Sequence, residues 1–321
     1  MHVVYCSPQL DGLAAAAIVF RAARLRGNDI KFGGILNFEN AEEQFTAMQK
    51  LSGDLIFILD FLPDNLPALE PKLNAITVRN RIAYWNSHHP HSESDGLILS
   101  RHAHTVDLSG PLHYAPVPKE KTCAAELAQK KFLPNDNIAK ELAEIAHDIE
   151  FWERTDKRAV ELADLIASGI EPKELIESLS KGILWSDKFE QLRQEYLAKK
   201  QHAMQDIISR LAVKNIAGLN FGFTLAPTIL QSSDAGQHVL DNHAGVDVSA
   251  VLYRNGRISF RKRETCNLNL AEIARLFGGG GHTYAAGARL TQFPSITREN
   301  FDKVLFEIDQ KLKTHFLKQT L

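Results

Sequence analysis

The chain has 321 residues and a formal net charge of −2, with 44% hydrophobic and 24% charged residues. This length exceeds the usual range of a single hydrophobic core, so we expect two domains. No apolar run approaches the roughly 20 residues of a membrane span, and the N-terminus lacks the pattern of a signal peptide. The cysteines Cys6, Cys123 and Cys266 are scattered and form no CxxC pair. This spacing argues against a disulfide framework or a structural zinc site, and favours a cytoplasmic location.

Short apolar runs alternate with helical segments in the first part of the chain. The runs of strand length cover residues 2–6, 55–61 and 81–85. Buried strands that alternate with helices indicate a parallel sheet with crossover helices. Ligands bind at the carboxyl ends of the strands in such sheets. The polar residues at these ends, around Asp11, Asp60 and His88, are therefore expected to share one edge of the sheet.

The second half of the chain changes from helical to strand-rich patterns. A long charge-rich segment suits helices that join two domains, and Asn255-Gly256 between two later apolar runs predicts a β-hairpin. The chain closes on a helix expected near residues 297–316. We predict an α/β fold in three parts. The parts are a parallel-sheet domain with flanking helices (1–170), a helical linker (171–212) and a smaller mixed α/β domain (213–321).

Four consecutive glycines, 278–281, precede His282. Glycines allow backbone N–H groups to converge on an anion without interference from side chains. A helix beginning near Ala285 would add its positive N-terminal end. Arg261, in the preceding predicted strand, could bind a phosphate through two hydrogen bonds. The alternatives are glycines needed only for the backbone and a solvated surface arginine.

Asp11, Asp60, His88 and Asp148 each lie at or just beyond the end of a predicted strand or helix. Carboxylates with one imidazole suit Mn²⁺ or Mg²⁺ better than a structural zinc. Taken singly, an aspartate after a strand is more often a turn or helix-cap residue. The prediction of a metal site therefore depends on the four residues acting together.

The order of these segments resembles the DHH phosphoesterase superfamily with its associated C-terminal domain. The matching segments are SPQLDG, ILDF, SHHP, TCAAELAQKKFLP, HDIEFW and LFGGGGHTYAAG. The superfamily includes RecJ-like exonucleases, oligoribonucleases, phosphatases of bisphosphorylated nucleosides and cyclic dinucleotide phosphodiesterases. The resemblance is nearest to the oligoribonuclease branch. It implies a DHH domain followed by a substrate-binding domain.

The resemblance also implies roles for individual residues. The metal ligands would be Asp11, Asp60, His88 and Asp148, with catalytic roles for Asp60 and His89. Substrate binding would fall to Arg261, Gly280, Gly281 and His282.

The motifs depart from the family pattern at three positions. Ser7 and Gln9 stand where the family has a histidine and an aspartate, and Ser87 replaces the aspartate of the D-H-H motif. The family binds two metals, and these losses remove one ligand set while the other stays complete. We therefore expect one intact metal site and one lost site.

The predicted function is a metal-dependent phosphoesterase, either a phosphodiesterase or a phosphatase, that uses a single Mn²⁺ or Mg²⁺. Its partner would be a short oligonucleotide or small nucleotide, with no membrane partner and with a homodimer left open. The alternative is a catalytically degenerate protein that binds nucleotide or nucleic acid on the same scaffold. Trp152, in HDIEFW, is expected in the core rather than as a platform for base stacking.

Overall fold

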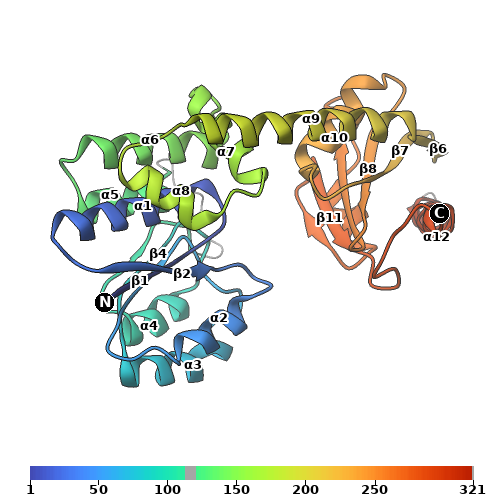
Figure 1. Ribbon diagram of the computed structural model, residues 1–321. Coiled ribbons are helices and arrows are strands. Elements are labelled where there is room, and N and C mark those ends of the chain that lie inside the picture. The colour runs from blue at the N-terminus through green and yellow to red at the C-terminus, as the bar shows by residue number, and fades with distance from the viewer. Residues whose placement is uncertain (113–120, 320–321) are drawn as a thin grey trace. The chain divides into compact units, whose positions relative to one another are not determined.

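The computed structural model describes residues 1–112 and 121–319. The chain forms two compact units, Met1–Tyr196 and Leu197–Leu321. The boundary falls inside one long helix, α9 (Asp187–Ser209), so no extended segment separates the units (Figure 1). The predicted division at residues 170 and 212 stays a prediction.

The first unit is built on a five-stranded parallel sheet, as the sequence predicts. Its strand order is β2-β1-β3-β4-β5. The strands are β1 (His2–Cys6), β2 (Ile30–Ile35), β3 (Leu55–Leu59), β4 (Arg81–Ser87) and β5 (Val106–Leu108). Because all five run the same way, their carboxyl ends meet at one edge, where polar side chains can converge.

Helices cover both faces of this sheet because its strand residues alternate between two cores (Figure 1). In β1, Val4 and Cys6 face one core, whereas Val3 and Tyr5 face the other. The first core contains α1 (Leu10–Leu25), α5 (Ala124–Phe132), α6 (Asn137–Glu150), α7 (Lys157–Ala167) and α8 (Pro172–Ser180). The second contains α2 (Ala41–Met48), α3 (Leu66–Arg79) and α4 (Glu93–His102). Helix α1 is apolar on every side because it packs on α5, α6 and α8 as well as on the sheet.

The second unit contains a six-stranded mixed sheet in the order β10-β11-β9-β8-β7-β6. Only β7 and β8 pair in parallel. The strands are β6 (Ala212–Ile216), β7 (Leu219–Ala226), β8 (Val248–Tyr253), β9 (Arg257–Lys262), β10 (Gly280–Gly281) and β11 (Ala285–Arg289). The predicted hairpin at Asn255-Gly256 is confirmed, since it joins the antiparallel strands β8 and β9.

Helices again pack on both faces of this second sheet. One core includes α11 (Leu270–Arg275) and α12 (Phe301–Gln319), and the other includes α10 (Ser232–Asn242) and the last turns of α9. In the part of the chain that the structure describes, no helix is long and apolar enough to cross a membrane.

The expectation of a helix beginning near Ala285 is wrong. Residues 285–289 form β11, which pairs along its whole length with β9 and places Ala285 opposite Arg261. The alanines favour a helix locally, but the antiparallel partner supplies a complete set of backbone hydrogen bonds, and this tertiary pairing outweighs propensity. No helix N-terminus therefore contributes to an anion site at this position.

Candidate metal centre and glycine loop

Three of the predicted metal ligands meet at the carboxyl edge of the first sheet. Asp11 lies in the first turn of α1, Asp60 directly follows β3, and His88 directly follows β4. His88 Nδ1 lies 2.9 Å from Asp60 Oδ1 and 3.2 Å from Asp11 Oδ2. The two carboxylates and the imidazole thus converge as the parallel sheet predicts.

The converging atoms are buried and poorly satisfied. Asp11 and Asp60 are fully buried, and His88 is nearly so. Apart from their approach to each other and the approach of Asp11 to His88, neither Asp60 Oδ1 nor His88 Nδ1 has a hydrogen-bond partner. Buried polar atoms without partners are costly unless something else binds them. Two groups of metal-capable side chains share His88, namely Asp60 with His88 and His89, and Asp11 with His88 and Glu150. Such carboxylates and imidazoles fit a hard or borderline divalent cation.

Glu150, at the end of α6, binds the far side of His88. Its Oε1 lies 3.0 Å from His88 Nε2, so Glu150 holds a proton on Nε2, and Nδ1 is the ring nitrogen that could give up its proton to bind a cation. A carboxylate on the second ring nitrogen is the usual way to orient a metal-binding histidine. Glu150 is not among the residues predicted from the sequence. The signal for it was a second carboxylate two residues after Asp148 in HDIEFW.

The pKa values in this cluster reflect an excess of negative charge. Burial, together with the neighbouring Asp11 carboxylate, raises the pKa of Asp60 to about 7. Burial opposes the charge of His88, but the surrounding carboxylates of Asp11, Asp60 and Glu150 outweigh burial and raise its pKa. Such a cluster holds protons when no cation is bound, and a divalent ion would displace them.

Backbone hydrogen bonds fix the carboxylates in place. Asp11 Oδ1 and Oδ2 each accept a backbone N–H at 2.7 Å, from Ala125 and Ala124 at the start of α5. The Asn86 side chain donates to the Ala124 carbonyl and accepts from the Asp60 N–H. Asp60 itself has a left-handed backbone, with φ of 54°. The site is therefore organised by the fold before any ion binds.

The three departures from the family motifs have structural explanations. Ser7 Oγ donates to Asp60 Oδ2 at 2.5 Å, so it satisfies the carboxylate oxygen opposite the one that faces His88. Ser87 Oγ accepts the N–H of His89. Gln9 is exposed at the N-cap of α1. Two of these side chains thus form polar contacts, and the third faces solvent.

Asp148 is held by the turn that follows α6. Its Oδ1 accepts hydrogen bonds from the Thr155 N–H and hydroxyl and from the Asp156 N–H, which close the turn after α6. Its Oδ2 is buried without a partner. Asp148 belongs to none of the metal-capable clusters found among the described residues, and its role as a ligand stays a prediction.

His89 faces the cluster from its exposed side. Its Nε2 lies 3.8 Å from Asp60 Oδ1, and its ring centroid is 4.4 Å from that of His88. Burial and the neighbouring His88 lower the pKa of His89. A neutral imidazole beside a buried cation site can donate a hydrogen bond or accept a proton.

Cys123, Glu126 and His147 form a further cluster of metal-capable side chains. Glu126 Oε2 accepts the Cys123 N–H at 2.9 Å and lies 2.9 Å from His147 Nδ1. Burial raises the pKa of Cys123 far above its usual range. These contacts cap the start of α5, and burial favours the protonated thiol, which is a weaker metal ligand than a thiolate.

The glycine loop of the second unit differs from the expected anion cradle. The N–H groups of Gly278, Gly279 and His282 already donate to carbonyl oxygens within the loop region. A Cβ at Gly279 would fall on the Gly287 carbonyl, so this glycine is required by the close approach of the backbones. These three N–H groups are therefore not available to an anion.

Other features of the loop leave room for a ligand. Gly280 is exposed, with open space where a Cβ would stand. The His282 ring stacks on Tyr284 at 5.4 Å, and Arg261 lies beside the loop through its pairing with Ala285. The binding roles of Arg261, Gly280, Gly281 and His282 stay predictions.

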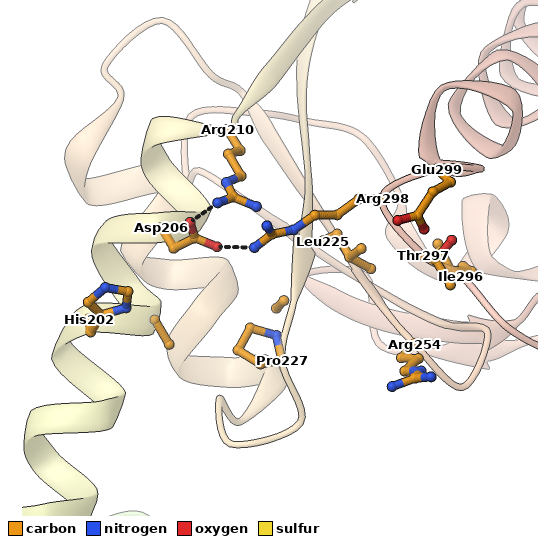
Figure 2. Close-up of a pocket in the computed structure, with 12 residues that line it drawn as sticks. His202, Asp206, Arg210, Leu225, Pro227, Arg254, Ile296, Thr297, Arg298 and Glu299 are labelled. Carbon is orange, nitrogen blue, oxygen red and sulfur yellow. Dashed lines mark hydrogen bonds and ion pairs between the residues drawn. The ribbon is translucent and has the colours of Figure 1, made fainter.

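A cavity of about 580 Å³ lies at the other end of the second sheet (Figure 2). It is lined by arginines near the end of α9, the β8–β9 turn and residues 296–299. Asp206 forms ion pairs with Arg210 and Arg298 at 2.7 and 3.4 Å, as Figure 2 shows. Two of the guanidinium groups are thus already paired, and the cavity contains none of the predicted site residues.

Solved structures share this architecture. RecJ from Thermus thermophilus in complex with Mn²⁺ has 15% identity and a TM-score of 0.59 over 99% of this chain, which spans about half of that protein (52%). The DHH domain of a protein described as a member of a family of ribosomal proteins has 14% identity and a TM-score of 0.63, covering 97% of this chain and 86% of that one. PggH, a pGpG-specific phosphodiesterase from Vibrio cholerae, has 15% identity and a TM-score of 0.51, covering 98% and 99%.

At identities this low, the structural similarity establishes only the fold, which is the one seen in these DHH-domain structures. Residues 230–314 match the DHHA1 domain. The chain therefore shares the fold of these DHH-domain structures, and its residues 230–314 match the DHHA1 family. No curated protein matches the sequence.

Proposed function

We propose that this chain is a phosphoesterase for short oligonucleotides or small nucleotides that uses one Mn²⁺ or Mg²⁺. The observation that carries the proposal is the convergence of Asp11, Asp60 and His88 with two buried ligand atoms unbonded. The shared fold with RecJ and PggH, whose names describe an exonuclease and a dinucleotide phosphodiesterase, supports the same class of reaction.

The ion would be held by Asp11, Asp60 and His88, with the free Oδ2 of Asp148 as the proposed fourth ligand. When bound, such an ion polarises a phosphoryl oxygen and lowers the pKa of a bound water. Glu150 keeps the proton on His88 Nε2, so that Nδ1 remains a ligand. The neutral His89 would contact the scissile phosphate from the exposed side. Arg261, Gly280, Gly281 and His282 would bind the terminal phosphate or the base end.

Loss of the first metal site predicts a slow enzyme. A second ion contributes several kcal/mol of charge stabilisation in two-metal hydrolases, and about 1.4 kcal/mol corresponds to a tenfold change in rate. We therefore expect turnover on the order of a thousandfold or more below that of a two-metal relative.

A protein that binds nucleotide or nucleic acid without cleaving it is the second candidate. It is favoured by Ser7, which occupies one oxygen of Asp60, and by the two backbone N–H groups that bind Asp11. Those contacts would hold the fold together whether or not an ion binds.

Hydrolysis assays separate the two candidates. Wild-type protein and Asp60→Asn are incubated with Mn²⁺ or Mg²⁺ and a panel of substrates. The panel contains RNA and DNA of two to five residues, a 3′,5′-bisphosphorylated nucleoside and cyclic dinucleotides. Metal-dependent turnover that Asp60→Asn abolishes supports the enzyme. Absence of turnover above the Asp60→Asn level, with nucleotide still bound, refutes the enzyme and leaves the binding protein.

A further inference from the structure

Trp152 is exposed, which contradicts its predicted place in the core. Its side chain is 56% exposed, and the Arg154 guanidinium lies over the indole at 3.4 Å from the ring centroid. Tryptophan is highly buried on average, so an exposed indole suggests a binding role. A guanidinium stacked on one side makes the indole part of a flat, positively charged surface.

The turn that presents Trp152 is strained. Trp152 and Arg154 both have left-handed backbones, with φ of 62° and 53°, a conformation that is unusual for large side chains. The carbonyl of Asp148 accepts the N–H groups of Glu153 and Arg154, and its Oδ1 accepts those of the next two residues. Asp148 thus holds the turn in a shape that keeps the indole out of the core. Strain of this kind concentrates at binding sites.

The same turn directly follows residues that contact the candidate metal centre. Glu150 binds His88 Nε2 at 3.0 Å, and the Phe151 ring lies 6.2 Å from the His88 ring. Trp152 is two residues beyond Glu150, so its Cα lies within roughly 7 Å of the Glu150 Cα. Lys121 Nζ lies 5.3 Å from the Phe151 ring. Aromatic rings and cations therefore alternate beside the centre, as in sites that stack the bases of single-stranded nucleic acids.

We propose that Trp152 and Arg154 form a stacking platform for a nucleobase of the substrate. This inference rests on the proposed function and gives it a specific substrate contact. The base stacks on the platform, while the phosphate next to it extends toward His89 and the metal centre. The platform selects ligands that carry an aromatic base, and a sugar phosphate without a base gains nothing from it.

Binding of two probes tests the platform. The 5′-phosphorylated diadenylate pApA carries bases, and ribose 5-phosphate does not. Affinities for wild type, Trp152→Phe, Trp152→Ala and Arg154→Ala are measured by calorimetry, with Ca²⁺ in place of Mn²⁺ to prevent turnover. Leu97→Ala, which truncates another exposed apolar side chain of the same unit, is the matched control. Thermal melting confirms that each variant is folded.

We expect Trp152→Ala to weaken pApA binding by about tenfold or more, the usual effect of removing an aromatic that stacks on a base. Trp152→Phe should stay within about threefold of wild type, Arg154→Ala should fall between the two, and ribose 5-phosphate should bind all variants equally. Unchanged pApA affinity in Trp152→Ala, equal losses for both probes, or no binding of pApA by wild type would overturn the platform.

Turnover of pApA with Mn²⁺ distinguishes failure of the platform from failure of the proposed function. Binding that depends on Trp152 without any hydrolysis refutes the proposed enzymatic activity and supports the platform. Hydrolysis with an unchanged kcat/KM in Trp152→Ala refutes the platform and supports the proposed enzymatic activity.

Discussion

Asp60 and Asp11 lie in one cluster, yet replacing each by asparagine should have different consequences. Asparagine tolerates the left-handed backbone at position 60, can still accept the Ser7 hydroxyl, and can donate its amide to the free His88 Nδ1. The pKa of Asp60, raised to about 7, indicates that a neutral side chain is tolerated there. We therefore expect metal-free Asp60→Asn to be within about 1 kcal/mol of wild type, in line with substitutions that leave no group unpaired.

Asp11→Asn should be costly even without metal. Both carboxylate oxygens accept backbone N–H groups in a fully buried position, and an asparagine offers only one acceptor oxygen. One buried N–H then loses its partner, at about 2–3 kcal/mol. For a unit of 196 residues, 1 kcal/mol corresponds to a shift of roughly 2–4 °C in Tm. The expected loss for Asp11→Asn is therefore about 4–12 °C.

Thermal melting in EDTA and in Mn²⁺ measures both effects. Wild type should gain about 2.7 kcal/mol at an ion concentration of 100 Kd, and Asp60→Asn should gain almost nothing. The reasoning is refuted if metal-free Asp60→Asn melts many degrees below wild type or keeps the full stabilisation by Mn²⁺. It is also refuted if Asp11→Asn has the same Tm as wild type.

Two further predictions concern residues outside the ligand set. Gly110→Ala should abolish stabilisation by Mn²⁺, because a Cβ there would fall on the carbonyl oxygens of His88 and His89. The control Gly96→Ala, in α4, has open space for a Cβ and should retain the stabilisation by Mn²⁺. Equal shifts in Tm with Mn²⁺ for the two variants would contradict this. Asp136→Asn should lower the free energy of unfolding by about 2 kcal/mol, because Asp136 pairs with Arg21 through both oxygens and caps α6. Arg21 lowers the pKa of Asp136 from its usual 3.8, so the carboxylate stabilises the fold above that pH and loses its effect as pH falls further. Urea unfolding at pH 7, 5 and 3 should show a difference in the free energy of unfolding between wild type and variant that persists to about pH 4 and then disappears. A difference that does not change with pH would exclude the ionic contribution.

The sequence predicted the first unit well because its fold follows from simple patterns. Apolar runs such as 55–61 are long enough to be strands and too short to be helices, and parallel strands bring their carboxyl ends to one edge. That rule alone placed Asp11, Asp60 and His88 together. The prediction was wrong at Ala285, because local propensity favours a helix there, whereas pairing with β9 makes these residues a strand.

The surroundings of α6 could not be predicted from the sequence. Whether Asp148 faces the metal or the turn, and whether Trp152 is buried, depends on a turn with two left-handed residues that no Gly or Asn marks. Glu150 contacts His88 from within α6, and residues 148 and 150 of a regular helix point in different directions. Spacing within HDIEFW could therefore identify a functional segment, but could not assign its side chains.

The position of Ser7 bears on whether the site still binds metal. Ser7 satisfies Asp60 Oδ2, the oxygen directed away from His88, and leaves Oδ1 without a hydrogen-bond partner. Glu150 in turn holds His88 Nε2 and leaves Nδ1 without one. Without a cation, these two atoms, 2.9 Å apart, are satisfied only by a proton held between the Asp60 carboxylate and the His88 imidazole, in line with the raised pKa values of both groups. A single cation between Asp60 and His88 would replace that proton and bind both atoms, so this geometry favours the proposed metal site over a pocket that only maintains the fold.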